Sequence, residues 1–149
     1  MRLTVTSPAP NFSLKDKEGR IHELEKIKSP FVVLYFYAKD NTAGCTIEAV
    51  EFTKHLDELK KLGATVIGIS GGDEKSKTVF CQKHNLNVLL LSDPDFSICR
   101  KYGVYGERKF LGRIFNGIKR ITFIIKDGKI IKVFDKVYPK EHVQEVILF

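Results

Sequence analysis

The stretch FVVLYFYAKDNTAGCT, residues 31–46, joins a long apolar run to a cysteine. Residues 31–38 form a continuous apolar run rich in aromatic and β-branched residues, which is typical of a strand buried on both faces. Small and polar residues follow from Lys39, and apolar residues at helical spacing begin just beyond Cys45. We therefore expect a central strand, a short turn and a helix, with Cys45 in the first helical turn.

Strand and helix patterns alternate on both sides of this stretch. They predict an extended edge arm at 1–10, a hairpin of 11–14 with 21–24, a helix at 43–62 ended by Gly63, a strand at 65–69, a helix from the cap Asp73 to His84, a strand at 88–91, a short helix from Asp93-Pro94 to Gly103, a loop at 105–116, a strand at 121–125 turning at Asp127-Gly128 into 130–134, and a helix at 140–148. This order predicts an α/β fold with right-handed crossovers and a thioredoxin-like sheet, in a single domain of residues 1–149.

Composition excludes several classes of protein. The chain has 149 residues, 43% of them apolar and 29% charged, which is typical of a globular domain. No apolar run approaches the roughly 20 residues of a membrane span, and the N-terminus has no apolar signal region, so we expect a cytoplasmic protein without membrane contact. Three cysteines form no framework of pairs, so a disulfide would be catalytic or regulatory.

The net charge of +7 could suggest nucleic acid, but the basic residues are dispersed among acidic ones. We interpret them as a solvated surface that does not bind nucleic acid. The residues so interpreted include Lys15, Lys17, Lys60, Lys61, Lys75, Lys77, Lys129, Lys132 and Lys136.

Cys45 has the placement of an activated thiol. If Thr42 is the N-cap, Cys45 is the third helical residue, where free N–H groups and the helix dipole stabilise a thiolate. Gly44 would let another atom approach the backbone closely. The competing interpretation is a buried, inert cysteine, but the carboxyl end of a central strand is where open α/β sheets place active sites.

Other cysteine chemistries fit less well. A dithiol oxidoreductase needs a second cysteine three residues on, where this chain has Glu48. The three candidate partners for a cysteine–histidine pair, His55, His84 and His142, lie in charged helical surroundings, and we expect them to be exposed. No cysteine or histidine pair has metal-ligand spacing, so we expect neither a metal nor another cofactor.

The stretch resembles the peroxidatic site of the peroxiredoxin Q branch, the bacterioferritin comigratory proteins. Their pattern is Y-P-K-D-x-T-P-G-C-T-x-E-A, and residues 37–49 read YAKDNTAGCTIEA, with Ala38 and Ala43 in place of the two prolines. The likeness continues in APNFSL, VIGIS, LLLSDPD, KYGV and RITFIIKDGKI. The resemblance implies a thioredoxin-like peroxiredoxin fold and a thiol peroxidase.

The resemblance also implies site residues. Cys45 would attack a peroxide, Thr42 would hold the peroxide by its hydroxyl, and Arg120 would stabilise the thiolate and the transition state. The Gly44–Cys45 backbone would add to the peroxide site. Glu48, which would orient Arg120, and Tyr37 would support the site from behind.

The resemblance implies the second half of the cycle as well. One branch position for a resolving cysteine is Val50 here, so that route is closed, while Cys81 matches the position in the next helix. An intramolecular Cys45–Cys81 disulfide would then be reduced by thioredoxin or a glutaredoxin-like dithiol, in a protein expected to be monomeric. Cys99 is expected in the core. A one-cysteine peroxidase resolved by an external thiol, and a slow redox sensor or binding protein, remain alternatives.

Overall fold

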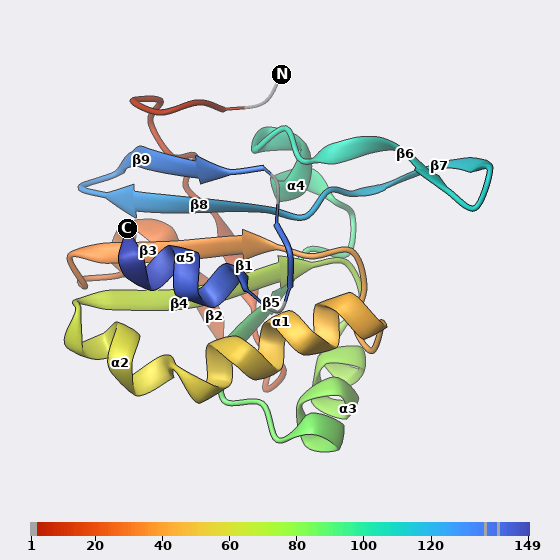
Figure 1. The fold of residues 1–149 in the computed structure, drawn as a ribbon, viewed down its shortest axis with the longest axis horizontal. Helices are drawn as coiled ribbons and strands as arrows, with labels where there is room; N and C mark the ends of the chain where they lie inside the picture. The colour runs from red at the N-terminus through yellow and green to blue at the C-terminus, as the bar shows by residue number, and fades with distance from the viewer. Residues whose placement is uncertain (1–2, 136, 140) are drawn as a thin grey trace.

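The computed structural model describes residues 3–135, 137–139 and 141–149. Within them a seven-stranded sheet has the order β2-β1-β5-β4-β3-β8-β9, and β6 and β7 form a separate hairpin (Figure 1). The strands are β1 (Ser13–Lys15), β2 (Ile21–Glu23), β3 (Phe31–Phe36), β4 (Ala64–Ser70), β5 (Leu89–Ser92), β6 (Tyr105–Phe110), β7 (Arg113–Ile118), β8 (Ile121–Lys126) and β9 (Lys129–Phe134). The helices are η1 (Leu24–Lys26), α1 (Ala43–Lys54), α2 (Leu56–Lys61), α3 (Glu74–His84), α4 (Ser97–Lys101) and α5 (His142–Leu148).

Strand β3 is the centre of the core, as its apolar sequence predicts. It pairs parallel with β4 and antiparallel with β8, so neither edge is exposed. Successive side chains of a strand point to opposite faces. Accordingly Val32, Leu34 and Phe36 pack in one buried cluster, while Val33 and Tyr35 pack in the other.

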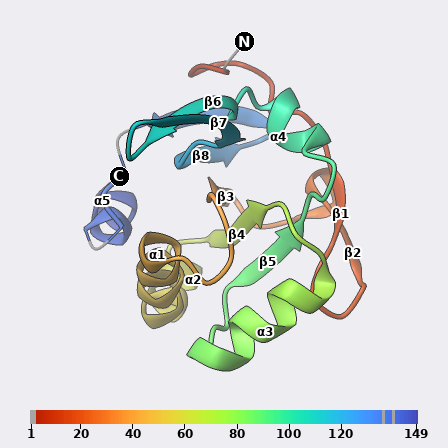
Figure 2. The same cartoon turned by 90° about the vertical axis from the view of Figure 1, so that its right-hand side faces the viewer.

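Helices cover both faces of the sheet. Figure 2 shows α1, α2 and α5 on one side and α4 on the other, with α3 beside β5. Phe80 and Cys81 of α3 share the buried cluster of Cys45 and Phe52 from α1. The two helices that carry Cys45 and Cys81 therefore contribute to one core on the same face.

The chain ends and turns agree with most of the sequence predictions. The amino-terminal arm follows the edge of β9, where the N–H of Thr6 donates to the carbonyl of Ile130 at 2.8 Å. The predicted hairpin forms as β1 and β2, and Asp127-Gly128 turns between β8 and β9 with positive φ at both residues. The start of the last helix, predicted at Lys140, lies outside the described residues. No helix of the described residues is long and apolar enough to cross a membrane.

Two helical predictions were wrong in their bounds. The helix expected over 43–62 is broken at His55, whose φ of −106° and ψ of 13° leave the helical region. The short helix expected from Asp93-Pro94 begins only at Ser97. Asp93 still caps it, because its carboxylate accepts from the N–H of Cys99 at 2.8 Å.

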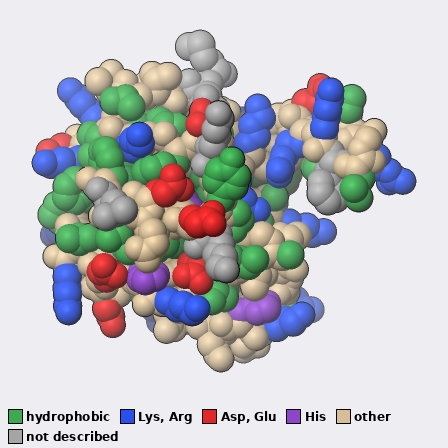
Figure 3. Space-filling view, viewed as in Figure 1, with side chains coloured by type: hydrophobic (Ala, Val, Ile, Leu, Met, Phe, Trp, Pro, Cys, Tyr) green, Lys and Arg blue, Asp and Glu red, His purple; other side chains and the backbone are tan. Residues whose placement is uncertain are grey.

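The prediction of a loop at 105–116 was wrong. Those residues belong to the β6–β7 hairpin, which projects from the body of the molecule (Figure 1). Its turn is Leu111-Gly112, with φ of 52° and 77°, a backbone typical of a tight hairpin turn. Side chains described in β7 are mostly exposed, so no buried alternation in the sequence marks a strand. Figure 3 shows basic side chains on this hairpin and along the rim of the face in view, interspersed with acidic ones.

Candidate active site

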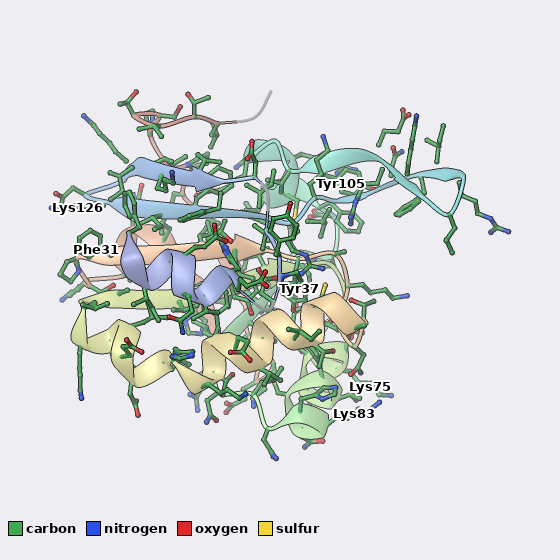
Figure 4. The ribbon with its side chains drawn as sticks, viewed as in Figure 1. Phe31, Tyr37, Lys75, Lys83, Tyr105 and Lys126 are labelled. Carbon is green, nitrogen blue, oxygen red and sulfur yellow. The ribbon has the colours of Figure 1, made fainter. Side chains whose placement is uncertain are left out.

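Cys45 lies where the sequence predicts, at the third residue of α1 beyond the carboxyl end of β3. Its side chain is only 1% exposed. Figure 4 labels Tyr37, which leads from β3 toward this end of α1, at the opposite end of the sheet from Phe31 and Lys126. The thiol is therefore buried at the helix N-terminus, where N–H groups have no intrahelical acceptor.

Thr42 is the N-cap by its backbone, with φ of −87° and ψ of 155°, but its side chain does not cap the helix. Its hydroxyl donates instead to the carbonyl of Lys39 at 2.9 Å. The Thr42 carbonyl accepts from the N–H and hydroxyl of Thr46. The proton of the Thr42 hydroxyl is thus engaged by the Lys39 carbonyl. A hydroxyl oxygen also has two lone pairs, so it can accept a hydrogen bond from a ligand.

Arg120 connects the thiol to a carboxylate. From just before β8 its Nη2 lies 3.3 Å from Cys45 Sγ, and its Nη1 donates to Glu48 Oε1 at 2.9 Å. A Cβ on Gly44 would stand 2.9 Å from Nη2, so any larger residue here would make the guanidinium shift from this position. The structure thereby brings Arg120 to three residues of α1 that the sequence also singled out, although it lies 75 positions from Cys45 in the chain.

The charges in this cluster are strongly perturbed by burial. Burial raises the pKa of Glu48 to about 7, against the opposing charge and hydrogen bond of Arg120. Burial also acts to lower the pKa of Arg120, but the negative charges of Cys45 and Glu48 outweigh it and the pKa is raised. Arg120 is therefore a fixed cation beside the sulfur, while Glu48 is a carboxyl that can gain a proton near neutral pH.

A cavity of about 410 Å³ opens beside Arg120. Arg108, Lys119, Asp135 and Tyr138 line it together with Arg120. It lies at the base of the β6–β7 hairpin and gives a small molecule a route toward the guanidinium. Its lining is polar and holds three cations against one carboxylate.

Tyr37 contacts the loop before Cys45. Its hydroxyl donates to Asp40 Oδ1 at 2.6 Å and its ring packs in the cluster that contains Cys45. Asp40 Oδ2 accepts from Nζ of Lys77, which is fully buried. The prediction that Lys77 belongs to a solvated surface was therefore wrong, because its partner Asp40 is 37 residues away and no local pattern marks it.

Cys81 and Cys99 differ from Cys45 in their surroundings. Cys81, 5% exposed in α3, faces a cavity of about 330 Å³ that Lys17 and His22 also line. Burial raises the pKa of the Cys81 thiol, and the charge of Lys17 offsets only part of this effect. Cys99 is fully buried in the other core cluster, as predicted, where burial and then Asp93 raise its pKa. All three cysteines are free thiols.

The prediction that the histidines are exposed was wrong for His142. It is fully buried behind the site, with Nε2 2.7 Å from the Thr122 hydroxyl and its ring against Phe52. Burial lowers the pKa of His142 and so favours the neutral ring, although the nearby Glu145 acts in the opposite direction. The sequence signal for its burial was its place four residues before the apolar Val146, which puts both side chains on the same face of α5. His55 and His84 are partly exposed.

This arrangement defines a class: a thioredoxin-like α/β fold that presents a buried cysteine, at a helix N-terminus, to an arginine. Residues 5–134 match the AhpC/TSA family, so the chain belongs to that family. Within it, the chain is similar to bacterial peroxiredoxins and is a thiol-dependent peroxidase of that kind.

Relatives and solved structures agree on the branch. The chain is 43% identical to peroxiredoxin Bcp of Escherichia coli over 141 residues, 94% of this chain and 90% of the relative. It is 37% identical to peroxiredoxin Bcp of Bacillus subtilis over 148 residues, 99% of this chain and 94% of that one. A crystal structure of a cysteine-to-serine mutant of Xylella fastidiosa PrxQ matches with a TM-score of 0.91 at 30% identity, covering 99% of this chain and 95% of the other.

Proposed function

We propose that Cys45 is the peroxidatic nucleophile of this thiol peroxidase and that hydrogen peroxide and organic hydroperoxides are its substrates. The single observation that carries the assignment is the 3.3 Å contact between Arg120 Nη2 and Cys45 Sγ in the first turn of α1. A cation and free N–H groups together favour a thiolate over a thiol. A structure of the Xanthomonas campestris bacterioferritin comigratory protein, which has alkyl peroxide reduction activity, matches with a TM-score of 0.85 at 32% identity, covering 92% of this chain and 88% of that one.

The first step is a displacement at oxygen. The Cys45 thiolate attacks the distal oxygen of the peroxide, a sulfur–oxygen bond forms and the oxygen–oxygen bond breaks. The leaving alkoxide or hydroxide takes a proton from solvent and departs as an alcohol or water. Arg120 stabilises the developing oxyanion, and the Cys45 N–H donates to the bound peroxide. Thr42 accepts the hydrogen bond of the peroxide O–H, since its own proton is engaged by Lys39.

Glu48 and Gly44 position this machinery. The carboxylate of Glu48 holds Nη1 so that Nη2 faces the sulfur, and Gly44 leaves the space through which Nη2 approaches. Tyr37 acts at one remove, through the loop residue Asp40. Contacts within the described residues support these roles.

The second step is resolution by Cys81. The Cys81 thiol attacks the Cys45 sulfenic acid, a disulfide forms and water leaves. Thioredoxin or a similar dithiol then reduces the disulfide and is itself oxidised. Both sulfur atoms lie in one core cluster on one face of the sheet, which supports this pairing over one with Cys99 in the other cluster. We further propose that residues 1–149 act as one domain and as a monomer.

One observation favours a second candidate. Cys81 is buried within a helix and its pKa is raised, so it is a weak nucleophile in the reduced structure. A one-cysteine peroxidase resolved by an external thiol would need no change at Cys81. A slow sensor would show the same thiolate with little turnover.

Peptide mapping after one equivalent of peroxide separates these candidates. Free thiols are blocked with iodoacetamide, and the disulfide-linked peptides are identified by mass spectrometry. The proposal expects a Cys45–Cys81 peptide, lost in Cys81→Ser and retained in Cys99→Ala. A sulfenic acid that persists at Cys45 in the wild type would favour the one-cysteine enzyme. A dominant Cys45–Cys99 peptide would refute the pairing.

A further inference from the structure

A buried polar cluster lies between the loop that leads to Cys45 and the helix that carries Cys81. We call it the Asp40 cluster: Tyr37, Asp40, Ser70, Ser76 and Lys77. The reaction steps given above do not use its ion pair. Asp40 is five residues before Cys45, and Lys77 is four residues before Cys81, one helical turn away.

The carboxylate of Asp40 is the hub of the cluster. Its Oδ1 accepts from the Tyr37 hydroxyl at 2.6 Å. Its Oδ2 accepts from the Ser76 hydroxyl at 2.6 Å and from Nζ of Lys77 at 3.0 Å. The loop before Cys45 is therefore fixed to α3 by two hydrogen bonds, one of them charged on both sides.

The ammonium of Lys77 is fully satisfied without water. Besides Asp40, it donates to the Ser70 hydroxyl at 2.8 Å and to the Gly71 carbonyl at 2.7 Å. Its side chain has no exposed surface. Burial lowers the pKa of Lys77 and Asp40 opposes that effect. A buried charge of this kind is stable only while its partner stays in place.

A further contact joins the same two elements. His84, the last residue of α3, lies with Nε2 3.1 Å from Oδ1 of Asn41 in the loop. By contrast, α1 begins with no side-chain cap at Thr42. The loop before Cys45 is thus held more by α3 than by the start of its own helix.

Disulfide formation has to disturb this attachment. The two sulfur atoms must come within about 2.05 Å of each other, with Cα atoms about 4.4–6.8 Å apart. Both thiols are free and buried within helices in the structure. Because Cys45 and Cys81 lie in the separate helices α1 and α3, we expect the loop with the first turn of α1, α3, or both to change position before Cys81 reaches the Cys45 sulfenic acid.

We propose that Asp40 and Lys77 are a positioning pair that holds the loop before Cys45 against α3 and thereby limits the rate of Cys45–Cys81 disulfide formation. This inference rests on the proposed function of Cys81. The step it governs is balanced without another reactant: the Cys81 S–H and the Cys45 S–OH become a disulfide and water. While the pair is closed, the sulfenic acid remains exposed to a second peroxide, which converts it to sulfinic acid.

The experiment compares Asp40→Asn, Lys77→Met and the double variant D40N/K77M. Each single variant strands a buried charge or a buried polar group, whereas the double variant removes both charges at similar volume. Lys75→Met is the matched control, since Lys75 lies exposed on the same helix (Figure 4). Val146→Ala, a core truncation in α5 away from the cluster, controls for loss of stability alone.

The measurement is quenched-flow mass spectrometry after one equivalent of peroxide. It follows the Cys45 thiol, the dimedone-trapped sulfenic acid and the Cys45–Cys81 peptide in the same samples. We expect the double variant to form the disulfide about tenfold faster than wild type, and to yield less sulfinic acid at high peroxide. Ser76→Ala, which removes one hydroxyl and no charge, should give a smaller acceleration.

The proposal and its main alternative predict opposite changes in the rate of disulfide formation. If Lys77 served instead to stabilise a Cys81 thiolate, Lys77→Met and the double variant would form the disulfide more slowly. A slower or unchanged rate in the double variant overturns the proposal, and so does an equal acceleration in Val146→Ala. Absence of a Cys45–Cys81 peptide from wild type overturns both this proposal and the resolving role of Cys81. A normal disulfide with an unaltered rate overturns the positioning pair alone.

Discussion

Cys45 and Cys81 are buried to nearly the same extent, 1% and 5% exposed, in helices that share one core. Cys45 lies in the first turn of α1 with a guanidinium nitrogen 3.3 Å from its sulfur. Cys81 lies toward the C-terminal end of α3, and burial raises its pKa. Similar burial therefore leaves the two thiols in different electrostatic surroundings, and charge and helix-end position are the features that tune the reactivity of a cysteine.

The two helices also differ in how they begin. At the start of α3, Asp73 accepts from the N–H of Ser76 at 2.8 Å. At the start of α1, the Thr42 hydroxyl bonds away from the helix. The helix that carries Cys45 thus lacks the side-chain cap that α3 has at its N-terminus.

The largest expected effect comes from removing the reactive member of the pair. Cys45→Ser should reduce peroxidase turnover by roughly 10³-fold or more, because a serine hydroxyl is not ionised at neutral pH. Cys99→Ala should keep turnover, since that thiol lies in the other core cluster. Peroxide consumption with a thioredoxin system measures both, and circular dichroism checks the fold. Substantial turnover in Cys45→Ser would show that Cys45 is not the nucleophile.

The next effect tests the charge that distinguishes the two thiols. Arg120→Met keeps the length of the side chain but removes the cation, so the peroxide step should slow by roughly 10²- to 10³-fold. Alkylation of Cys45 at neutral pH should slow as well, because the variant holds less thiolate. Stopped-flow peroxide kinetics and iodoacetamide labelling measure the two effects. Arg113→Met, on the exposed hairpin, is the control. Unchanged rates in Arg120→Met would show that the helix end suffices.

The position of Cys45 in the fold could be predicted from the sequence. Strand β3 reads as buried on both faces, and the change of pattern at Lys39 marks the start of a helix, so Cys45 could be placed by local rules. Arg120 lies 75 residues away and came from resemblance to a family motif. Local pattern alone would have left it as a solvated arginine at a strand end.

The buried polar residues could not be predicted, for a physical reason. Burial of Lys77 depends on Asp40, and burial of His142 on Thr122, partners that only the folded chain brings near. Each has a charged or polar local sequence that a solvated surface would share. The β6–β7 hairpin was missed because its strands are exposed and its turn has Leu111 where asparagine or aspartate is usual.

A smaller effect concerns Glu48, whose carboxyl group pairs with Arg120 beside Cys45. The pKa of Glu48 is raised from 4.5 to about 7 in the folded protein. Between these values the folded state binds a proton that the unfolded state has released, so the free energy of unfolding falls as pH rises through this window, by up to about 3 kcal/mol. In Glu48→Gln this fall should be absent.

Urea unfolding of wild type and Glu48→Gln from pH 4 to 8 measures that difference. Glu25→Gln, at an exposed position in η1, should unfold with the pH dependence of the wild type. If wild type and Glu48→Gln lose stability in parallel as the pH rises, the carboxyl is ionised throughout and remains a plain partner of Arg120.

The smallest effect tests whether the uncapped start of α1 matters. Ala43 is the first residue of α1, where proline is favoured, and Thr42 already has the extended backbone that a following proline requires. Ala43→Pro should therefore raise the free energy of unfolding by about 0.4–1 kcal/mol, through the unfolded state. The stiffer turn should open less often, so disulfide formation should slow and the sulfenic acid should reach sulfinic acid at lower peroxide. Ala43→Gly, the matched opposite change, should lower the melting temperature and tolerate more peroxide. Thermal melts and peroxide-dose inactivation curves of the three proteins measure these effects. A lower melting temperature in Ala43→Pro would mean that the backbone at the start of α1 does not accept proline. A higher melting temperature with unchanged peroxide sensitivity would mean that movement of α3, and not opening of the first turn of α1, limits disulfide formation.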